Sequence, residues 1–225
     1  PRRGSLGAAV NVTIPNTPVP VFPLTGVFLF PHQLLPLHIF EPRYRQMIED
    51  LLDGPGRLVL ASPRRRRAPD AGDLPEVAGL GEIVRHEKLP DGRFMIWVLG
   101  LARVQITERP SARLYRTVQC EPFVEVDVPA DEVASLAAAL RQAASERLRE
   151  PLPLPEGAPP ALLTDLLLQT LAATPAVLHR AFAEPSVAAR AHYALRQSRR
   201  PRSADAEDEA SPPTDPASDF HAAAR

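Results

Sequence analysis

The sequence predicts an α+β protein in which a β-rich barrel is followed by a small helical bundle. Two observations carry this prediction. Along residues 94–106 apolar or small residues recur at every second position, the pattern of a strand with a buried face. After Pro129 they recur at three- and four-residue spacing, the pattern of amphipathic helices. With 225 residues, the chain is long enough for one large domain or for a domain with a smaller appendage.

Extended segments dominate the first half of the chain. The stretch FPHQLLPLHIF, residues 30–40, contains Pro31 and Pro36, which exclude a continuous helix, and it is too apolar for a solvated loop. We therefore expect a buried strand over residues 34–40. The turn Pro90-Asp91-Gly92 predicts a hairpin between its flanking strands. Further extended segments are expected at residues 19–22, 27–30, 57–62, 79–89, 93–106 and 114–128.

The segment at residues 93–106 is the most informative of these. Its even positions predict one face packed in the core. These positions are Phe94, Ile96, Val98, Gly100, Ala102, Val104 and Ile106. Odd positions such as Met95, Trp97 and Leu99 are apolar as well, so the middle of the strand is expected to be covered on both sides. A glycine at the centre of so long a strand predicts a bend or β-bulge, as at the corner of a small barrel.

A helix is expected directly after residues 34–40. Pro42 suits a first helical turn, and an apolar stripe from Tyr44 to Leu52 ends at Asp53-Gly54. We expect this helix to close one end of the barrel. Glu41, Arg43 and Arg45 lie at the junction, where a salt bridge or an interaction with the helix terminus is the structural interpretation and a binding role is the alternative.

Four helices are expected after Pro129. Asp131 is expected to cap the first, which would run to Leu148 before a proline-rich break at residues 151–160. A strongly apolar helix follows at residues 162–171. Thr174-Pro175 and Pro185 are expected to open the last two.

These patterns divide the chain into four parts. We expect a flexible leader at residues 1–18, the barrel at 19–128, the helical bundle at 129–197 and a disordered tail at 198–225, which is rich in charge, proline and serine. A single cysteine, Cys120, excludes an internal disulfide and fits a reducing compartment. We find neither a signal peptide nor a run of about 18 apolar residues that could span a membrane, and we expect a cytoplasmic protein.

The chemistry-bearing residues form no recognisable catalytic or cofactor motif. Lys88 is the only lysine and does not follow a glycine-rich turn, so a Walker motif is excluded and a local Ser-Lys dyad has no support. The six histidines have no spacing that indicates a metal site. We therefore expect no catalytic residues, cofactor or metal. The alternative is an enzyme without a recognisable motif, which would depend on His38, Glu41 or His86.

A run of four arginines, Arg64, Arg65, Arg66 and Arg67, forms the one obvious basic patch. It is interpreted as a solvated loop, because proline and alanine flank it in place of the aromatic residues that stack on nucleic-acid bases. Contact with RNA or with an acidic partner is the alternative. The formal net charge of −1 gives no overall attraction to nucleic acid or anionic lipid.

Two stretches resemble a known family. VPVFPLTGVFLFPHQLLPLHIFEPRYRQMI and GLGEIVRHEKLPDGRFMIWVLGLARVQI resemble the N-terminal substrate-binding domain of Lon proteases, which also occurs in cereblon and in free-standing bacterial proteins. The resemblance covers residues 19–128, and LAATPAVLHRAFAEPSVAARAHYALRQ is similar to the helical part that follows in the family. It implies a PUA-like pseudo-barrel with a helical bundle behind it, and recognition of unfolded or damaged substrates. The ATPase and Ser-Lys peptidase modules of the full protease have no counterpart here.

The resulting hypothesis is a non-catalytic module that binds unfolded or extended apolar segments of other proteins, in one form as an adaptor working with a protease or chaperone. Met95, Trp97 and Phe123 are candidates for an apolar contact patch, and His38, Glu41 and Arg43 for its surroundings. Backbone pairing to an edge strand of the barrel would add to side-chain burial. The alternative is an RNA-binding PUA-like module that uses Arg64 to Arg67. Oligomeric state is left open.

Overall fold

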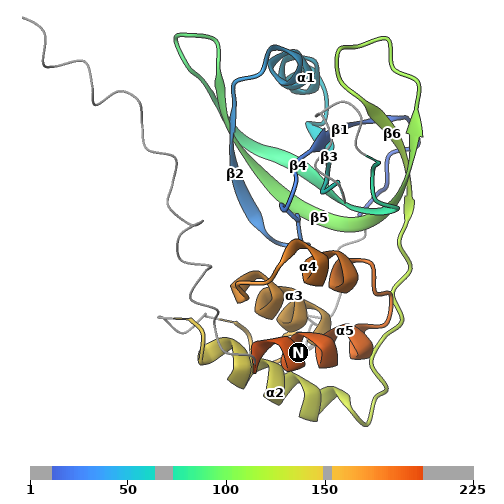
Figure 1. The fold of residues 1–225 in the computed structure, drawn as a ribbon, viewed down its shortest axis with the longest axis vertical. Coiled ribbons are helices and arrows are strands. Elements are labelled where there is room, and N and C mark those ends of the chain that lie inside the picture. The colour runs from blue at the N-terminus through green and yellow to red at the C-terminus, as the bar shows by residue number, and fades with distance from the viewer. Residues whose placement is uncertain (1–11, 64–72, 149–153, 200–225) are drawn as a thin grey trace, which may run out of the picture.

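The computed structural model describes residues 12–63, 73–148 and 154–199. Figure 1 shows a β-barrel with a layer of helices packed below it, as the sequence predicts. Within the described residues, the barrel half contains six strands and one helix. In chain order these are β1 (Val19–Pro23), β2 (Leu34–Ile39), α1 (Pro42–Leu52), β3 (Arg57–Ala61), β4 (Val77–Lys88), β5 (Phe94–Arg109) and β6 (Thr117–Pro122).

The barrel closes because β5 is long enough to have different neighbours along its length. The sheet order is β2-β5-β4-β3-β1-β6, and β6 pairs back onto β5, so five strands form a ring. The pairing of β1 with β3 is parallel and the others are antiparallel. Strand β2 lies outside this ring and pairs with residues 94–99 of β5, whereas β6 pairs with residues 104–109.

The corner predicted at Gly100 is confirmed. The β4–β5 register shifts between Leu80 and Gly81, opposite Gly100, and again between Ile83 and Arg85. A Cβ atom on Gly100 would overlap the carbonyl oxygen of Phe30, so the absence of a side chain allows another backbone segment to lie against the sheet.

Residues 27–30 form that segment, and the extended structure expected there is not a strand. The chain runs across the sheet at this point, with Leu29 and Phe30 buried and the Leu29 carbonyl pressed against Gly79. In sequence this segment looks like a buried strand, because its apolar side chains fill positions in both the barrel core and the helical core. Leu29 packs inside the barrel and Phe30 packs among the helices.

Helix α1 closes one end of the barrel, as expected. Tyr44, Met47, Ile48 and Leu51 are buried and join the barrel core with residues such as Leu58 and Ile96. Glu41 stands at the N-cap without a side-chain capping hydrogen bond, and Pro42 occupies the first turn. The helix ends at Leu52 with Asp53 at its C-cap, as expected, and the glycine with positive φ is Gly56 and not Gly54.

The helical half contains α2 (Val133–Ser145), α3 (Pro160–Thr170), α4 (Pro175–Phe182) and α5 (Val187–Ser198). Three expected boundaries were wrong. Helix α2 has Glu132 and not Asp131 at its N-cap, and it ends before Leu148. Pro185 lies outside α5, whose N-cap Ser186 accepts a hydrogen bond from the Ala189 N–H at 3.2 Å. The segment expected to be extended over residues 114–128 is a strand only at β6.

The two halves share a core at their junction. Phe28 and Phe30 pack with Phe182, at ring-centroid distances of 5.6 and 5.1 Å. Val12 and Ile14, which fall in the expected leader, pack against the barrel core, and Cys120 is buried on β6. The expected tail from residue 200 onward lies outside the described residues. Among the described residues, no helix combines the length and the apolar character needed to cross a membrane.

Replacing Gly100 with alanine tests the close approach of residues 27–30. We expect Gly100→Ala to lower the free energy of unfolding by about 1–3 kcal/mol, because the added methyl group overlaps the Phe30 backbone, which has little room to move. Urea denaturation followed by circular dichroism measures the change. The matched control is Gly157→Ala, because no atom lies within 4 Å of the Cβ that it adds. Equal stability of the two variants would contradict this account of Gly100.

Candidate functional site

An apolar surface covers the outside of the sheet where β2 and β5 meet. Antiparallel pairing aligns three residue pairs on one face of the two strands. We call this surface the outer face, and its pairs are Leu34 with Leu99, Pro36 with Trp97 and His38 with Met95. The inward residues of β2 alternate with these, and Ile39, for example, is buried in the core.

The outer face is open to solvent on its β2 side. Leu34 is 54% exposed, Pro36 and His38 are exposed, and Met95, Trp97 and Leu99 are half-buried. Phe40, at 62% exposure, follows β2 and lies near His38, with a ring-centroid distance of 6.1 Å. A group of large apolar side chains left exposed together is typical of a binding surface.

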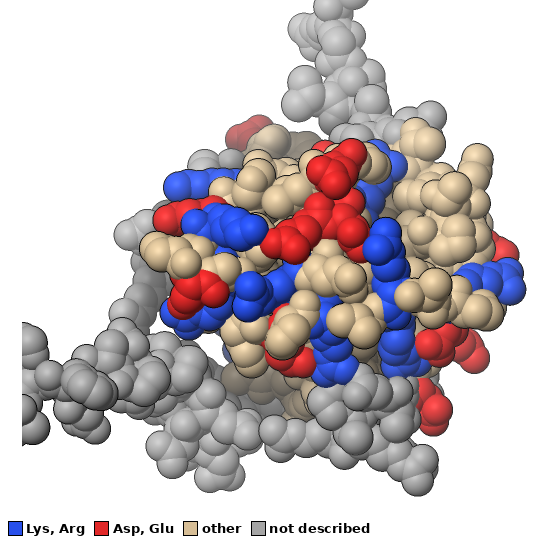
Figure 2. All heavy atoms as spheres, turned by 90° about the horizontal axis from the view of Figure 1, so that it is seen from above, with Lys and Arg blue, Asp and Glu red and all other residues tan. Residues whose placement is uncertain are grey.

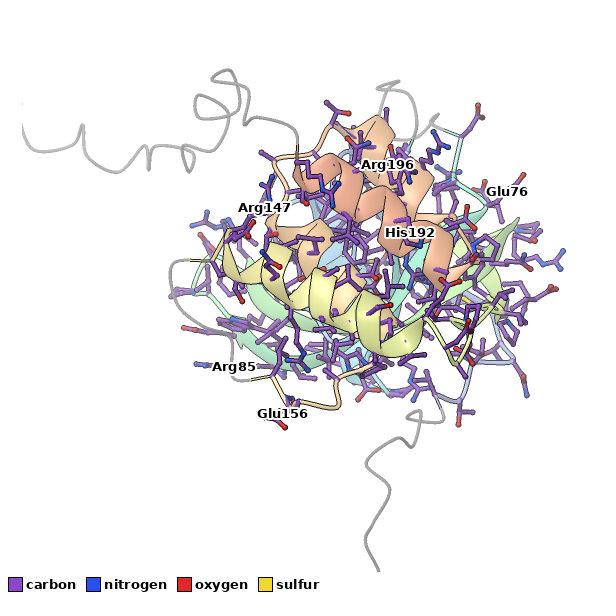
Figure 3. The ribbon with its side chains drawn as sticks, turned by 90° about the horizontal axis from the view of Figure 1, so that it is seen from below. Glu76, Arg85, Arg147, Glu156, His192 and Arg196 are labelled. Atoms are coloured by element: carbon purple, nitrogen blue, oxygen red, sulfur yellow. The ribbon has the colours of Figure 1, made fainter. Side chains whose placement is uncertain are left out.

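Strand β4 adds a charged margin beside the outer face. Arg85 pairs with Trp97 in the sheet and places its guanidinium 4.6 Å from the centroid of the indole ring. Glu87 pairs with Met95 on the same row. Figure 3 shows Arg85 at the rim of the molecule, pointing away from the helices. A charged row on β4 therefore flanks the two rows of the outer face.

The outer face brings together three of the residues that the sequence analysis selected. Met95, Trp97 and His38 are neighbours across β2 and β5. Glu41 and Arg43 are placed at the start of α1, where Arg43 Nη2 lies 2.7 Å from Glu41 Oε2 and its guanidinium lies 4.8 Å from the centroid of the Tyr44 ring. This geometry matches the structural interpretation of the junction.

The residues of the enzyme alternative do not converge. His38 pairs with Met95, whereas His86 pairs with Ile96, the next residue of β5, so the two histidines project from opposite faces of the sheet. Cys120 is buried, which raises the pKa of its thiol to about 11 and makes it a poor nucleophile. No group of three His, Cys, Asp or Glu residues in the described parts of the chain could hold a metal ion.

The end of the barrel closed by α1 carries charges of both signs. Figure 2 shows this end with basic and acidic side chains interspersed. They pair locally, with Lys88 Nζ 2.8 Å from Glu49 Oε1 and Arg93 Nε 2.6 Å from Asp91 Oδ2. Such a surface lacks the continuous positive stripe that follows a nucleic-acid backbone. Arg64, Arg65, Arg66 and Arg67 lie outside the described residues.

Phe123, the remaining candidate, is not among the residue pairs of the outer face. It follows β6 and lies 5.0 Å from the guanidinium of Arg103, measured to its ring centroid. Both residues line a cavity of about 410 Å³ at the junction of the barrel and the helices. Phe123 therefore lies at the junction of the barrel and the helices.

Three buried charged residues and Glu125, whose side chain is 33% exposed, hold this junction together. We call Arg103, Glu125, Asp165 and Arg190 the clasp. Glu125 forms ion pairs with both arginines, at 2.8 Å from Arg190 Nη1, and Asp165 Oδ1 lies 3.2 Å from Arg190 Nε. Arg103 Nη1 also donates to the Phe182 carbonyl oxygen at 3.0 Å. The clasp thus connects β5, the β6–α2 connection, α3 and α5.

Burial controls the protonation of the clasp. It raises the pKa of Asp165 to about 7, against an opposing effect of Arg103, and it lowers the pKa of Arg103. The Asp165 and Arg190 atoms lie within ion-pair distance but are not aligned as a hydrogen bond. The sequence analysis missed these residues. Their only local signal is a charged side chain within an apolar strand or helix, such as Asp165 between Leu163 and Leu167.

Comparison with known proteins adds a family match. The family model described as the ATP-dependent protease La (LON) substrate-binding domain matches residues 18–207. The chain is 30% identical over 127 residues to a Lon protease of Desulfovibrio desulfuricans, covering 56% of this chain and 13% of that protein. It is 29% identical over 155 residues to a Lon protease of Geobacter metallireducens, covering 68% and 18%. The chain thus spans less than a fifth of either relative.

Solved structures show the same fold. The N-terminal domain of a Mycobacterium avium complex Lon protease matches with a TM-score of 0.61 at 18% identity, over 81% of this chain and 98% of that one. A Lon N-terminal domain protein from Xanthomonas campestris matches with a TM-score of 0.59 at 17% identity, over 80% and 98%. These likenesses confirm the α+β architecture.

Replacing Asp165 with asparagine tests the buried acid of the clasp. Because the pKa of Asp165 is raised on folding, its stabilising contribution is complete below pH 4 and is lost as the pH rises to about 7. Asparagine cannot lose a proton. Between pH 5.5 and 7 we therefore expect the wild type to lose about 1.6 kcal/mol of unfolding free energy relative to Asp165→Asn.

Urea unfolding of both proteins at pH 5.5, 7 and 8 measures the difference. It should change much less between pH 7 and pH 8, because the acid passes there from half to almost fully deprotonated. A constant difference across all three pH values would show that Asp165 does not titrate in this range in the folded state.

Proposed function

The chain belongs to the family of the ATP-dependent protease La (LON) substrate-binding domain, and from this premise we propose that it is a non-catalytic module that binds unfolded or extended polypeptide segments on the outer face. The family description supports binding of substrate. The geometry of this chain supports an extended, apolar segment as the ligand.

The observation that carries the proposal is the pair of apolar rows on β2 and β5. Leu34, Pro36 and Leu99 leave apolar surface in contact with water, and a partner that covers it gains roughly 25 cal/mol for each Å² removed from solvent. A folded partner would need a matching concave surface.

The surroundings of the outer face favour selection by shape and apolar character over charge. Arg85 is stacked on Trp97, and the neighbouring Glu87 offsets its charge. Such a site would accept many sequences that share apolar residues at alternate positions. Unfolded and damaged proteins share this exposure of normally buried segments.

A non-catalytic role is supported by the placement of the polar residues. His38 and His86 point to opposite faces of the sheet, and Glu41 is ion-paired with Arg43. Lys88, the single lysine, is paired with Glu49. No described nucleophile is therefore paired with a base at the outer face, as covalent catalysis would need.

We further propose that the module works as an adaptor in cytoplasmic protein quality control, presenting bound segments to a separate protease or chaperone. Binding by burial of a few apolar side chains is weak and rapidly reversible, which suits transfer of a client to another protein.

A charge placed on the outer face tests the proposal. We expect Leu34→Lys to weaken binding of a fluorescein-labelled, permanently unfolded polypeptide about tenfold, because a charged group would be buried against apolar residues. Leu34 is exposed, so the substitution should leave stability unchanged. Leu114→Lys is the matched control, since Leu114 is 69% exposed and lies in the β5–β6 connection.

Fluorescence anisotropy at low and high salt reads out the affinity, with a labelled RNA as a second ligand. Polypeptide binding that survives high salt and is lost only in Leu34→Lys supports the proposal. Salt-sensitive RNA binding without polypeptide binding would instead support the RNA alternative, and no binding of either ligand would contradict both.

A further inference from the structure

We infer that the bound segment adds to the barrel as an extra β-strand along the free edge of β2, and that Pro36 reserves this edge for other chains by opposing self-pairing. This inference rests on the proposed function and specifies how the ligand is held. It depends on three features of β2: the direction of its backbone groups, the lack of charge along its edge, and the position of its proline.

The direction of the backbone groups follows from the register. The Gly100 N–H donates to the Gln33 carbonyl oxygen at 2.8 Å, so the backbone of Gln33 faces β5. Antiparallel pairing alternates facing and non-facing residues. Leu34, Pro36 and His38 therefore direct their backbone groups away from β5. Pro36 fits this assignment, because a proline within a strand must lie where no ladder donor is needed.

The outward edge of β2 thus offers three carbonyl acceptors, at Leu34, Pro36 and His38, and two N–H donors, at Leu34 and His38. Within the described residues β2 pairs with β5 alone. An extended polypeptide placed alongside can satisfy these groups, with every second residue of the added strand facing β2. The side chains that the added strand directs to the same side as Leu34 would then form a third apolar row.

The end of β4, on the other side of β5, forms an edge that is protected against strand addition. The β3 ladder covers β4 only at residues 79–82, which leaves residues 84–88 of β4 without a described partner on that side. That edge carries a register irregularity at Val84 and the charged side chains of Arg85, Glu87 and Lys88. Bulges and charges are devices that discourage strand addition. Strand β2 has neither a bulge nor an Asp, Glu, Lys or Arg side chain among its six residues, LLPLHI.

Pro36 selects against a second copy of this chain. Two β2 strands related by a twofold axis would pair antiparallel, and a pairing centred on the outward groups would place Pro36 against Pro36. Both central residues would then lack a donor, and two carbonyl oxygens would be left without partners. A ligand of different sequence supplies its own N–H opposite the Pro36 carbonyl and loses only one hydrogen bond.

Backbone methylation of a ligand distinguishes strand addition from simple burial of side chains. The probe is a labelled eight-residue peptide of alternating valine and serine, compared with two versions that carry N-methyl groups on alternate amides, one on each set. In an added strand only one set faces β2. We expect methylation of that set to weaken binding about tenfold or more and methylation of the other set to leave it unchanged.

The outcomes separate the inference from the proposed function. If the unmodified peptide binds and both methylated versions bind equally well or equally poorly, strand addition is wrong while polypeptide binding stands. If the unmodified peptide does not bind to a protein that captures the unfolded polypeptide, strand addition is again overturned. If neither ligand binds, the proposed function fails with it.

A second variant tests Pro36 itself. Pro36→Val restores an outward N–H at the centre of β2 and suits a strand. We expect this variant to bind the unmodified peptide several-fold more tightly and to self-associate more than the wild type, as measured by sedimentation velocity at matched concentrations. An unchanged affinity together with unchanged self-association would overturn the role assigned to Pro36.

Discussion

The contact on which the rest of the structure depends is the close approach of residues 27–30 to the backbones of Gly79 and Gly100. It lets one short segment contribute Leu29 to the barrel interior and Phe30 to the helical core. The same glycines lie beside the register shift at which β5 changes neighbours. Ring closure, the β2–β5 extension and the seating of the helices therefore depend on two positions that tolerate no side chain.

Strand β5 contributes residues both to the apolar outer face and to the charged clasp. Along one side of this strand, Trp97 and Leu99 remain partly accessible to solvent. Arg103, a few residues further along, is buried at the junction with the helices and forms an ion pair with Glu125. A buried ion pair contributes little net stability but is costly to break on one side. The clasp is thus better suited to fixing the orientation of barrel and bundle than to strengthening either half.

Local patterns predicted the elements of this fold better than its contacts. The alternation along β5, the glycine corner and the capping helix α1 are encoded within short stretches, and the structure confirms them. Residues 27–30 were misjudged because an apolar crossing segment and a strand look alike in sequence. The position of β2 at an edge, and the meeting of Arg103, Asp165 and Arg190, depend on pairing between distant segments, which no local period reveals.

Trp97 gives the molecule an optical property that follows from its position. It is the only tryptophan in the chain, and only three tyrosines accompany it. Its indole lies half-buried beside Pro36 and beneath the guanidinium of Arg85. Ultraviolet emission excited at the red edge of protein absorption therefore originates at the outer face alone. The protein carries its own fluorescent label at the surface where a ligand would arrive, without any dye or added residue.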